Sequence, residues 1–362
     1  MKLNRIFFLV LFLLIGSFSF AVSYPLFQSS NRTLEDAHSA FDSKDYGAAL
    51  RLAEEAKIIR RQEVSECLEI LDQALKPFAV RSAGDLITDV RSVLLKRDVF
   101  DAVELIDYLI SIKGEKYFEG FISNMRAFIE SKNIFPETGY LIARVYELEG
   151  EYDLAYSYFM DSWEHSDVLD IPDVKYDILY DMANLSYNFN HKDECEKALL
   201  LVLSSDPYFS DNAFMKSLKS SVARGYSADK LFGLFRTDCY RSLPAFYRLV
   251  ELYVEQGREE EAFSIALIGV LTAFTRMNTI YTDRTNDFQY TTLTDFFDVV
   301  MKQSDITDWS VKTGFWKCLY TLADLGVKLY PENNSFGKAL LSIIATESPD
   351  DYWKKLALFQ SF

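Results

Sequence analysis

The stretch from Gly139 to Phe159 reads GYLIARVYELEGEYDLAYSYF, and the rest of the chain can be interpreted from it. Its apolar residues recur at intervals of three and four, which is typical of helices, and only Gly150 interrupts them. Small side chains stand on either side of that glycine, at Ala143 and Ala155. Two helix axes approach closely only where the side chain at the crossing is small. The stretch therefore predicts two short helices that are joined by a tight turn at Gly150 and packed together.

This arrangement resembles the tetratricopeptide repeat, an antiparallel helix pair of about 34 residues. The resemblance assigns the small positions to Ala143 and Ala155, the aromatic positions to Tyr146 and Tyr152, and the turn to Gly150. It implies a curved stack of helix pairs in which each pair buries its apolar face on the next.

Other stretches resemble the same repeat. FYRLVELYVEQGREEEAFSIA places Gly257 at the turn and Ala262 in the second small position. LYDMANLSYNFNHKDECEKALLLVLSSDP has Asn190 in place of the glycine and Cys195 in the small position. Two weaker stretches, AHSAFDSKDYGAALRLAEEA and LITDVRSVLLKRDVFDAVELI, contribute the small residues Ala49 and Ala102. The spacing between these positions is irregular, so extra helices or diverged repeats are expected between them.

The whole chain favours an all-α fold, an α-α superhelix similar to a tetratricopeptide array. Only 14 glycines and 8 prolines occur in 362 residues, and no convincing strand pattern appears. Weak helix stops, such as Gly47, Gly150 and Gly257, divide the chain into helices of roughly 12 to 16 residues. The expected organisation is a polar linker over residues 24–32, a repeat array over 33–334 and capping helices over 335–362.

The first 23 residues have the features of a secretory signal peptide. Lys2 and Arg5 precede an apolar run, and small residues at Ala21 and Ser23 suit cleavage. The alternative is an uncleaved anchor, which would be the chain's only attachment to a membrane. Either way we expect an exported protein, in a bacterial periplasm or cell envelope, with secretion as the second choice.

Charge and chemistry restrict the function further. The formal net charge of -16 disfavours nucleic acid as a partner, because an acidic surface repels phosphate. The four cysteines have no CxxC spacing, and we interpret them as small buried residues rather than metal ligands. None of the three histidines lies in a catalytic motif. We therefore expect no enzyme activity, no cofactor and no metal.

The resemblance also selects candidate binding residues, because the first helix of each repeat lines the concave face. Tyrosine occupies one equivalent position in three repeats, and its large apolar ring with a polar tip suits a peptide. The packing of the repeats themselves would explain the same tyrosines. The candidates are Tyr140, Arg144, Glu147, Tyr180, Asn184, Tyr187, Tyr247 and Glu251.

Three functions remain open. The first is a non-enzymatic scaffold that holds a protein or peptide partner in the cell envelope. The second is a periplasmic component that binds a small hydrophobic ligand or accompanies a transporter, which would require an enclosed apolar cavity. The third is an enzyme that acts on cell-wall glycan, which would require two facing carboxylates in a cleft.

Overall fold

The computed structural model describes residues 27–75, 87–97, 100–114, 117, 122–206, 209, 211–234, 240–285 and 288–360. All regular structure in these residues is helical, and none of them lies in a β-strand. The prediction of an all-α fold is confirmed. The predicted signal peptide, residues 1–23, lies outside the described residues.

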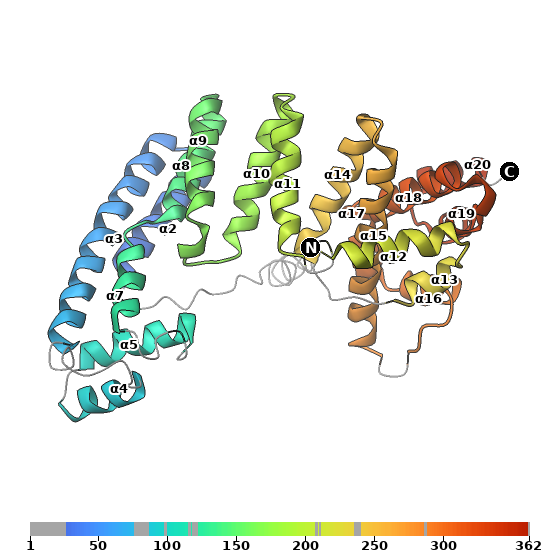
Figure 1. Cartoon of the computed structure of the whole chain (residues 1–362). Helices are drawn as coiled ribbons and strands as arrows, with labels where there is room; N and C mark the ends of the chain where they lie inside the picture. Colours follow the sequence, from blue (N-terminus) through green and yellow to red (C-terminus); the bar gives the residue numbers. More distant parts are fainter. Residues whose placement is uncertain are drawn as a thin grey trace, which may run out of the picture. The chain divides into compact units, whose positions relative to one another are not determined.

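The chain divides into two compact units (Figure 1). Unit 1 ends at Ile178 and unit 2 begins at Leu179, so the division falls inside α10 (Val174–Asn188). Each unit has its own buried core, and each is described by itself below.

Unit 1 is built from consecutive helices that pack against their neighbours. α2 packs on α3, α3 packs on α8, and α8 packs on α9. The helices of this unit are α2 (Gln28–Asp42), α3 (Tyr46–Leu75), α4 (Ile87–Lys96), α5 (Phe100–Lys113), α7 (Ile122–Ser131), α8 (Pro136–Glu149), α9 (Tyr152–Glu164) and the 3₁₀ turn η3 (Ser166–Val168).

Unit 2 continues in the same manner. α11 packs on α14, α14 on α15, α15 on α18, and α18 on α19. Its elements after α10 are α11 (Lys192–Ser204), α12 (Asn212–Ala223), α13 (Ala228–Phe232), η4 (Tyr240–Ser242), α14 (Leu243–Glu255), α15 (Glu259–Thr282), α16 (Leu293–Val300), α17 (Ser304–Lys312), α18 (Phe315–Leu329), η5 (Pro331–Asn333), α19 (Ser335–Glu347) and α20 (Asp351–Gln360).

Four helix-to-helix turns in the described residues share one backbone geometry and one distance to the second helix, which the similar turn at Gly225 does not have because α13 begins three residues after it. Each contains one residue in the left-handed conformation, and these residues are Lys44, Gly150, Asn190 and Gly257. At Gly150, the residue's own N–H donates to the carbonyl of Glu147 and the next N–H donates to that of Tyr146. The other three turns repeat this pair of bonds. The pattern ends the first helix by satisfying its last carbonyls, and the second helix begins two residues after the left-handed residue.

The second helix of each of these pairs has a small residue at the same place. Ala49, Ala155, Cys195 and Ala262 each lie five positions after the left-handed residue and are at most 1% exposed. Each donates its backbone N–H to the residue that directly precedes the second helix. The prediction that these four residues are equivalent, small and buried is confirmed, including the replacement of the turn glycine by Asn190.

Helix lengths and one turn differ from the prediction. α3 has 30 residues and α15 has 24, well beyond the expected range. Gly47 is not a stop, because it lies in the first turn of α3 and the chain reverses three residues earlier, at Lys44. Lysine is a rare residue in the left-handed conformation, so the sequence carried no obvious signal for this turn.

The predicted linker over residues 24–32 is also wrong in its described part. α2 begins at Gln28 rather than after residue 32. The reason is that Phe27 is buried at 1% exposure, while Glu63 on α3 accepts hydrogen bonds from the free backbone N–H groups of Ser29 and Ser30. A side chain from a neighbouring helix thus caps α2.

The C-terminal residues 335–362 form helices as far as they are described, but their grouping differs. α19 packs closely on α18 and belongs with it, and α20 packs on α19. The predicted boundary between residues 334 and 335 therefore separates two helices that form a pair.

Among the described helices, α15 is long and apolar enough to cross a membrane by composition alone. However, 72% of its most apolar window is buried inside the protein. It lies against α14 and α18, and a core helix passes the same test.

Candidate functional site

The candidates on α8 are packed within unit 1 rather than laid open. Tyr140 is half-buried, with its ring centroid 5.9 Å from that of Phe159. The Arg144 guanidinium lies 4.5 Å from the ring centroid of Phe41 on α2. Glu147 is half-buried as well. In this unit α2 covers part of the face that the resemblance assigned to a partner.

Arg144 also faces His38 on α2. Burial lowers the pKa of His38, and the positive charge of Arg144 lowers it further. The imidazole therefore stays neutral at physiological pH.

The candidates on α10 belong to unit 2 and are more accessible. The Tyr180 hydroxyl donates a 2.6 Å hydrogen bond to the carbonyl of Arg241. Asn184 is exposed, and Tyr187 is 46% exposed. The Tyr187 hydroxyl donates to Glu255 Oε1 at 3.0 Å, and this bond raises the pKa of Tyr187.

On α14, Glu251 is exposed and Tyr247 is not. Glu251 Oε1 lies 2.6 Å from Nζ of Lys317 on α18, in an exposed ion pair. Tyr247 is 8% exposed, so the prediction that it lines an accessible face is wrong. The reason is Gly269 on α15: an added Cβ there would meet Phe246 at 2.8 Å and the Tyr247 ring at 3.5 Å, so the absence of a side chain lets α15 pack closely over the tyrosine.

Side-chain contacts connect the first helices of successive pairs in unit 2. Tyr187 joins α10 to α14 and Glu251 joins α14 to α18. Six exposed residues of these helices make up what we term the α10–α14–α18 face. They are Asn184, Tyr187, Glu251, Val254, Glu255 and Lys317. Five of the six carry polar or charged groups, which suits a ligand that offers hydrogen bonds.

The ion pairs on this face are weak. Lys192 Nζ lies 3.0 Å from Glu255 Oε2, and the two side chains are 35% and 43% exposed. Exposed pairs of this kind contribute at most about 1 kcal/mol to stability. The hydrogen bonds of Lys192 and Tyr187 lower the pKa of Glu255, so its carboxylate stays charged. A cationic partner could replace Lys192 beside Glu255, or Lys317 beside Glu251, at little cost in free energy.

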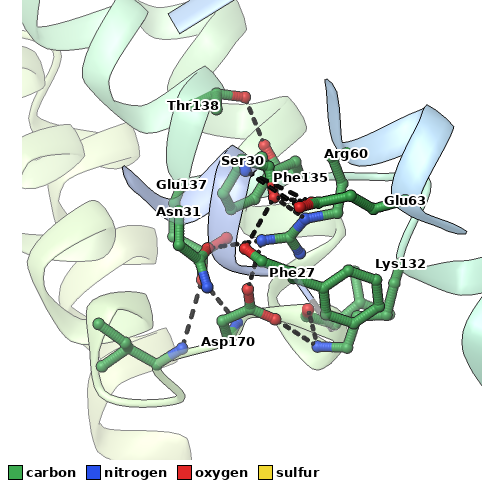
Figure 2. A network of polar contacts seen from close by, with 12 residues as sticks. Phe27, Ser30, Asn31, Arg60, Glu63, Lys132, Phe135, Glu137, Thr138 and Asp170 are labelled. Carbon is green, nitrogen blue, oxygen red and sulfur yellow. Dashed lines mark hydrogen bonds and ion pairs between the residues drawn. The ribbon is translucent and has the colours of Figure 1, made fainter. Parts of the chain in front are cut away.

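Unit 1 contains a buried polar network that the sequence analysis missed (Figure 2). Arg60 on α3 is fully buried, and its guanidinium lies 3.7 Å from the ring centroid of Phe135 and 4.6 Å from that of Phe27. It donates to Ser30 and Asn31 on α2, at 2.8 and 2.6 Å. The rings cover the cation while oxygen atoms of α2 satisfy its N–H groups.

Asp170, in the connection between α9 and α10, joins the network to two cations. Arg60 Nη2 and Lys132 Nζ each donate to its carboxylate at 2.8 Å. Burial alone would raise the pKa of Asp170, but the charges and hydrogen bonds of Arg60 and Lys132 outweigh it and lower the pKa. Removing one partner of a buried ion pair is strongly destabilising, because it leaves an uncompensated charge. Arg60 and Lys132 therefore hold the connection firmly through Asp170.

Glu137, in the first turn of α8, is the other carboxyl of this network (Figure 2). Its Oε1 accepts hydrogen bonds from the backbone N–H groups of Asp170 and Ile171, at 2.6 and 3.3 Å. Its Oε2 is buried and has no partner. Burial, and then repulsion by Asp170, raise the pKa of Glu137 to about 7.

One sequence signal could have revealed part of this network. Arg60 lies in the buried stripe of α3, which runs through Ala56 and Val64 at intervals of four. A charged residue at such a position needs buried partners. The sequence gives no comparable signal for Lys132, Glu137 or Asp170, because each resembles a solvated charge near a helix end.

Three cysteines have the predicted structural role. Cys67, Cys195 and Cys318 are buried free thiols, and burial raises the pKa of each. Cys239 lies outside the described residues. No group of three or more histidine, cysteine or acidic side chains suited to a metal ion occurs in the described part of the chain.

Unit 2 also has a hollow of about 720 Å³ near the start of α15. Leu200, Phe209 and Ile265 line it together with the charged residues Arg258 and Glu260. Glu260 is 76% exposed, so the hollow meets solvent. It differs from the enclosed apolar cavity that a small hydrophobic ligand would require.

Comparison with known proteins gives a distant relative and no family. No protein-family model matches the chain. The chain is 28% identical over 300 residues to an uncharacterized protein of Treponema pallidum (strain Nichols). The matched region covers 81% of this chain and 79% of that relative.

Proposed function

We propose that this chain is an exported, non-enzymatic scaffold of tetratricopeptide-like helix pairs that holds a protein or peptide partner. The observation that carries the proposal is the recurring turn. Four helix pairs use the same left-handed residue, the same two hydrogen bonds and the same small buried residue five positions later. Stacked pairs of this kind present their first helices on a common face, which is the usual binding surface of repeat proteins.

The α10–α14–α18 face of unit 2 is the part of the chain that we assign to the partner. Asn184 offers both a donor and an acceptor, which suits the backbone of an extended peptide. Tyr187 adds exposed ring area, and the carboxylates of Glu251 and Glu255 favour cationic side chains. The candidates on α8 have a packing role instead, because α2 covers them in part.

Affinity capture from the native envelope fraction tests the proposal. The bait is the mature full chain, compared with a double variant, Asn184→Ala with Tyr187→Ala. Tyr226→Ala is a matched control, because Tyr226 is 48% exposed in the same unit and lies outside this face. We expect one recurrent protein partner with the wild type and the control, and its loss with the double variant.

Two results would contradict the proposal. If all three baits retain the partner equally, the partner does not bind this face. If the wild type retains a lipid or metabolite and no recurrent protein, the second function considered above is the better one.

A further inference from the structure

The connection between α9 and α10, residues 169–173, is held through two carboxyl groups, its own Asp170 and Glu137 of α8. The Asp170 side chain reaches Arg60 and Lys132. The backbone N–H groups of Asp170 and Ile171 donate to Glu137 Oε1. One short segment therefore carries both an ion-pair attachment and a hydrogen-bond attachment (Figure 2).

The charges around Glu137 do not balance when it is ionised. α3 contributes Arg60 and Glu63, the turn after α7 contributes Lys132, and the connection contributes Asp170. α2 contributes only the neutral Ser30 and Asn31. Two cations thus face two carboxylates before Glu137 is counted. Both cations bind Asp170, while Glu137 Oε2 is buried without a partner.

We propose that Glu137 is a proton-dependent latch: its neutral carboxyl holds residues 169–173 against α8, and loss of the proton releases them. The neutral group accepts the two backbone N–H bonds without placing a further charge beside Asp170. The ionised group accepts the same bonds more strongly, but it leaves an uncompensated buried anion next to another carboxylate. Release of the segment admits water to that anion.

The position of the latch gives it a consequence beyond the segment itself. Residues 169–173 lead directly into α10, the helix in which the chain passes from unit 1 to unit 2. The proton on Glu137 therefore controls how firmly the chain is fixed where it leaves unit 1. The raised pKa of Glu137, about 7, places the change near neutral pH.

Hydrogen–deuterium exchange of the full chain tests this latch, since Asp170 and Ile171 donate the bonds that open. Protection is measured at about pH 6 and about pH 8, corrected for the intrinsic pH dependence of exchange. We expect the protection of the wild-type connection to fall about tenfold between these values. The turn at Gly150 should keep its protection.

Two variants complete the design. Glu137→Gln keeps a neutral group of the same shape, so the connection should be equally protected at both pH values. Asp107→Asn removes the charge of an exposed carboxylate in the same unit, which pairs with Arg91 outside this network, and it should leave the wild-type pH response in place.

The latch is overturned if the wild-type connection is equally protected at both pH values. It is also overturned if Glu137→Gln loses protection as the wild type does. Circular dichroism establishes that the variants are folded. Should Glu137→Gln fail to fold, the wild-type comparison of the connection with the Gly150 turn decides the question.

Discussion

At the scale of single residues, equivalent sequence positions have different surroundings. Tyr140, Tyr180 and Tyr247 each precede a left-handed turn residue by ten positions. The first packs on Phe159, the second bonds the carbonyl of Arg241, and the third is buried. The repeat register was predictable from sequence. The exposure of each tyrosine was not, because it depends on how closely the neighbouring helices pack against it.

Tyr247 gives the first prediction. Its hydroxyl is buried without a hydrogen-bond partner, which raises its pKa through burial and costs free energy in the folded state. Tyr247→Phe should therefore raise the free energy of unfolding by up to about 1 kcal/mol, measured by urea denaturation. Tyr180→Phe is the control. This substitution should lower the free energy of unfolding, because it removes the hydrogen bond to the carbonyl of Arg241. A loss of stability in Tyr247→Phe would contradict this account.

The pH dependence of stability gives the second prediction. Folding raises the pKa of Glu137 from 4.5 to about 7, so the folded chain binds this proton more tightly than the unfolded chain. The contribution of Glu137 to stability is thus fully present below pH 4.5, is lost as the pH rises through about 7, and is constant above that. Asp170 acts in the opposite direction, because its lowered pKa gives a contribution that is present above pH 3.8 and lost in acid.

Glu137→Gln isolates the first of these effects. At pH 8 the variant should be more stable than the wild type, by on the order of 2 kcal/mol, and at about pH 5 the two should differ little. Urea denaturation of the full chain at both pH values measures this difference. If the difference between variant and wild type is the same at pH 5 and pH 8, folding does not raise the pKa of Glu137.

Arg60 gives the third prediction, from the same network. Arg60→Ala would leave Asp170 with one cation and open a space between Phe27 and Phe135. We expect a loss of roughly 3 to 5 kcal/mol. Arg91→Ala is the matched control, because Arg91 forms an exposed pair with Asp107 in the same unit and should cost at most about 1 kcal/mol. Similar losses of stability in both variants would mean that the burial of Arg60 does not determine its contribution to stability.

At the scale of helices and turns, the conformation of one residue at each turn fixes where the chain reverses. Gly257 has φ of 71°, and nothing lies within 4 Å of the Cβ that a side chain would add. Substitution there strains the backbone without a steric clash. By contrast, Gly47 lies in the first turn of α3 with ordinary backbone angles, and a Cβ added there would lie 4.0 Å from Asp45 Oδ1.

These two glycines give the fourth prediction. Gly257→Ala should lower the free energy of unfolding by about 1 to 2 kcal/mol, because alanine tolerates the left-handed region poorly. Gly47→Ala should raise it by roughly 0.5 to 1 kcal/mol, because it restricts the unfolded chain at a helical position. Thermal unfolding, monitored by circular dichroism, measures the change in stability of each variant. Equal effects in the same direction would contradict the turn geometry.

The sequence predicted those elements that local residue patterns determine. Turns at Gly150, Asn190 and Gly257 follow from a breaker between two apolar stripes, and the structure has all three. The turn at Lys44 and the lengths of α3 and α15 do not follow from such a pattern. Lysine carries no turn signal, and no glycine or proline interrupts the chain between Gly47 and the end of α3.

The sequence predicted less of the candidate site. Asn184 and Glu251 are exposed on first helices, as the repeat register indicated, while Tyr247 is covered. The network of Arg60 and Asp170 joins residues 110 positions apart. Contacts of that range depend on how the pairs stack, and one sequence does not encode them in a local pattern.

At the scale of the whole molecule, the account depends on unit 2 presenting its first helices to a partner. The chain carries a net charge of -16, so a partner of opposite charge would be attracted to it at long range. In our proposal, the α10–α14–α18 face adds specific contacts to that attraction, through Asn184, Tyr187 and Glu251. Binding should therefore weaken as salt is added, but it should not disappear.

Site-specific photo-crosslinking in the cells that naturally produce the chain tests whether a protein partner binds the α10–α14–α18 face. A photoreactive phenylalanine analogue replaces Tyr187 on the face, and in a separate chain it replaces Tyr226, which has nearly the same exposure. The account predicts a discrete protein crosslink from position 187 and none from position 226. No protein crosslink at 187, or the same crosslinks at both positions, would contradict it.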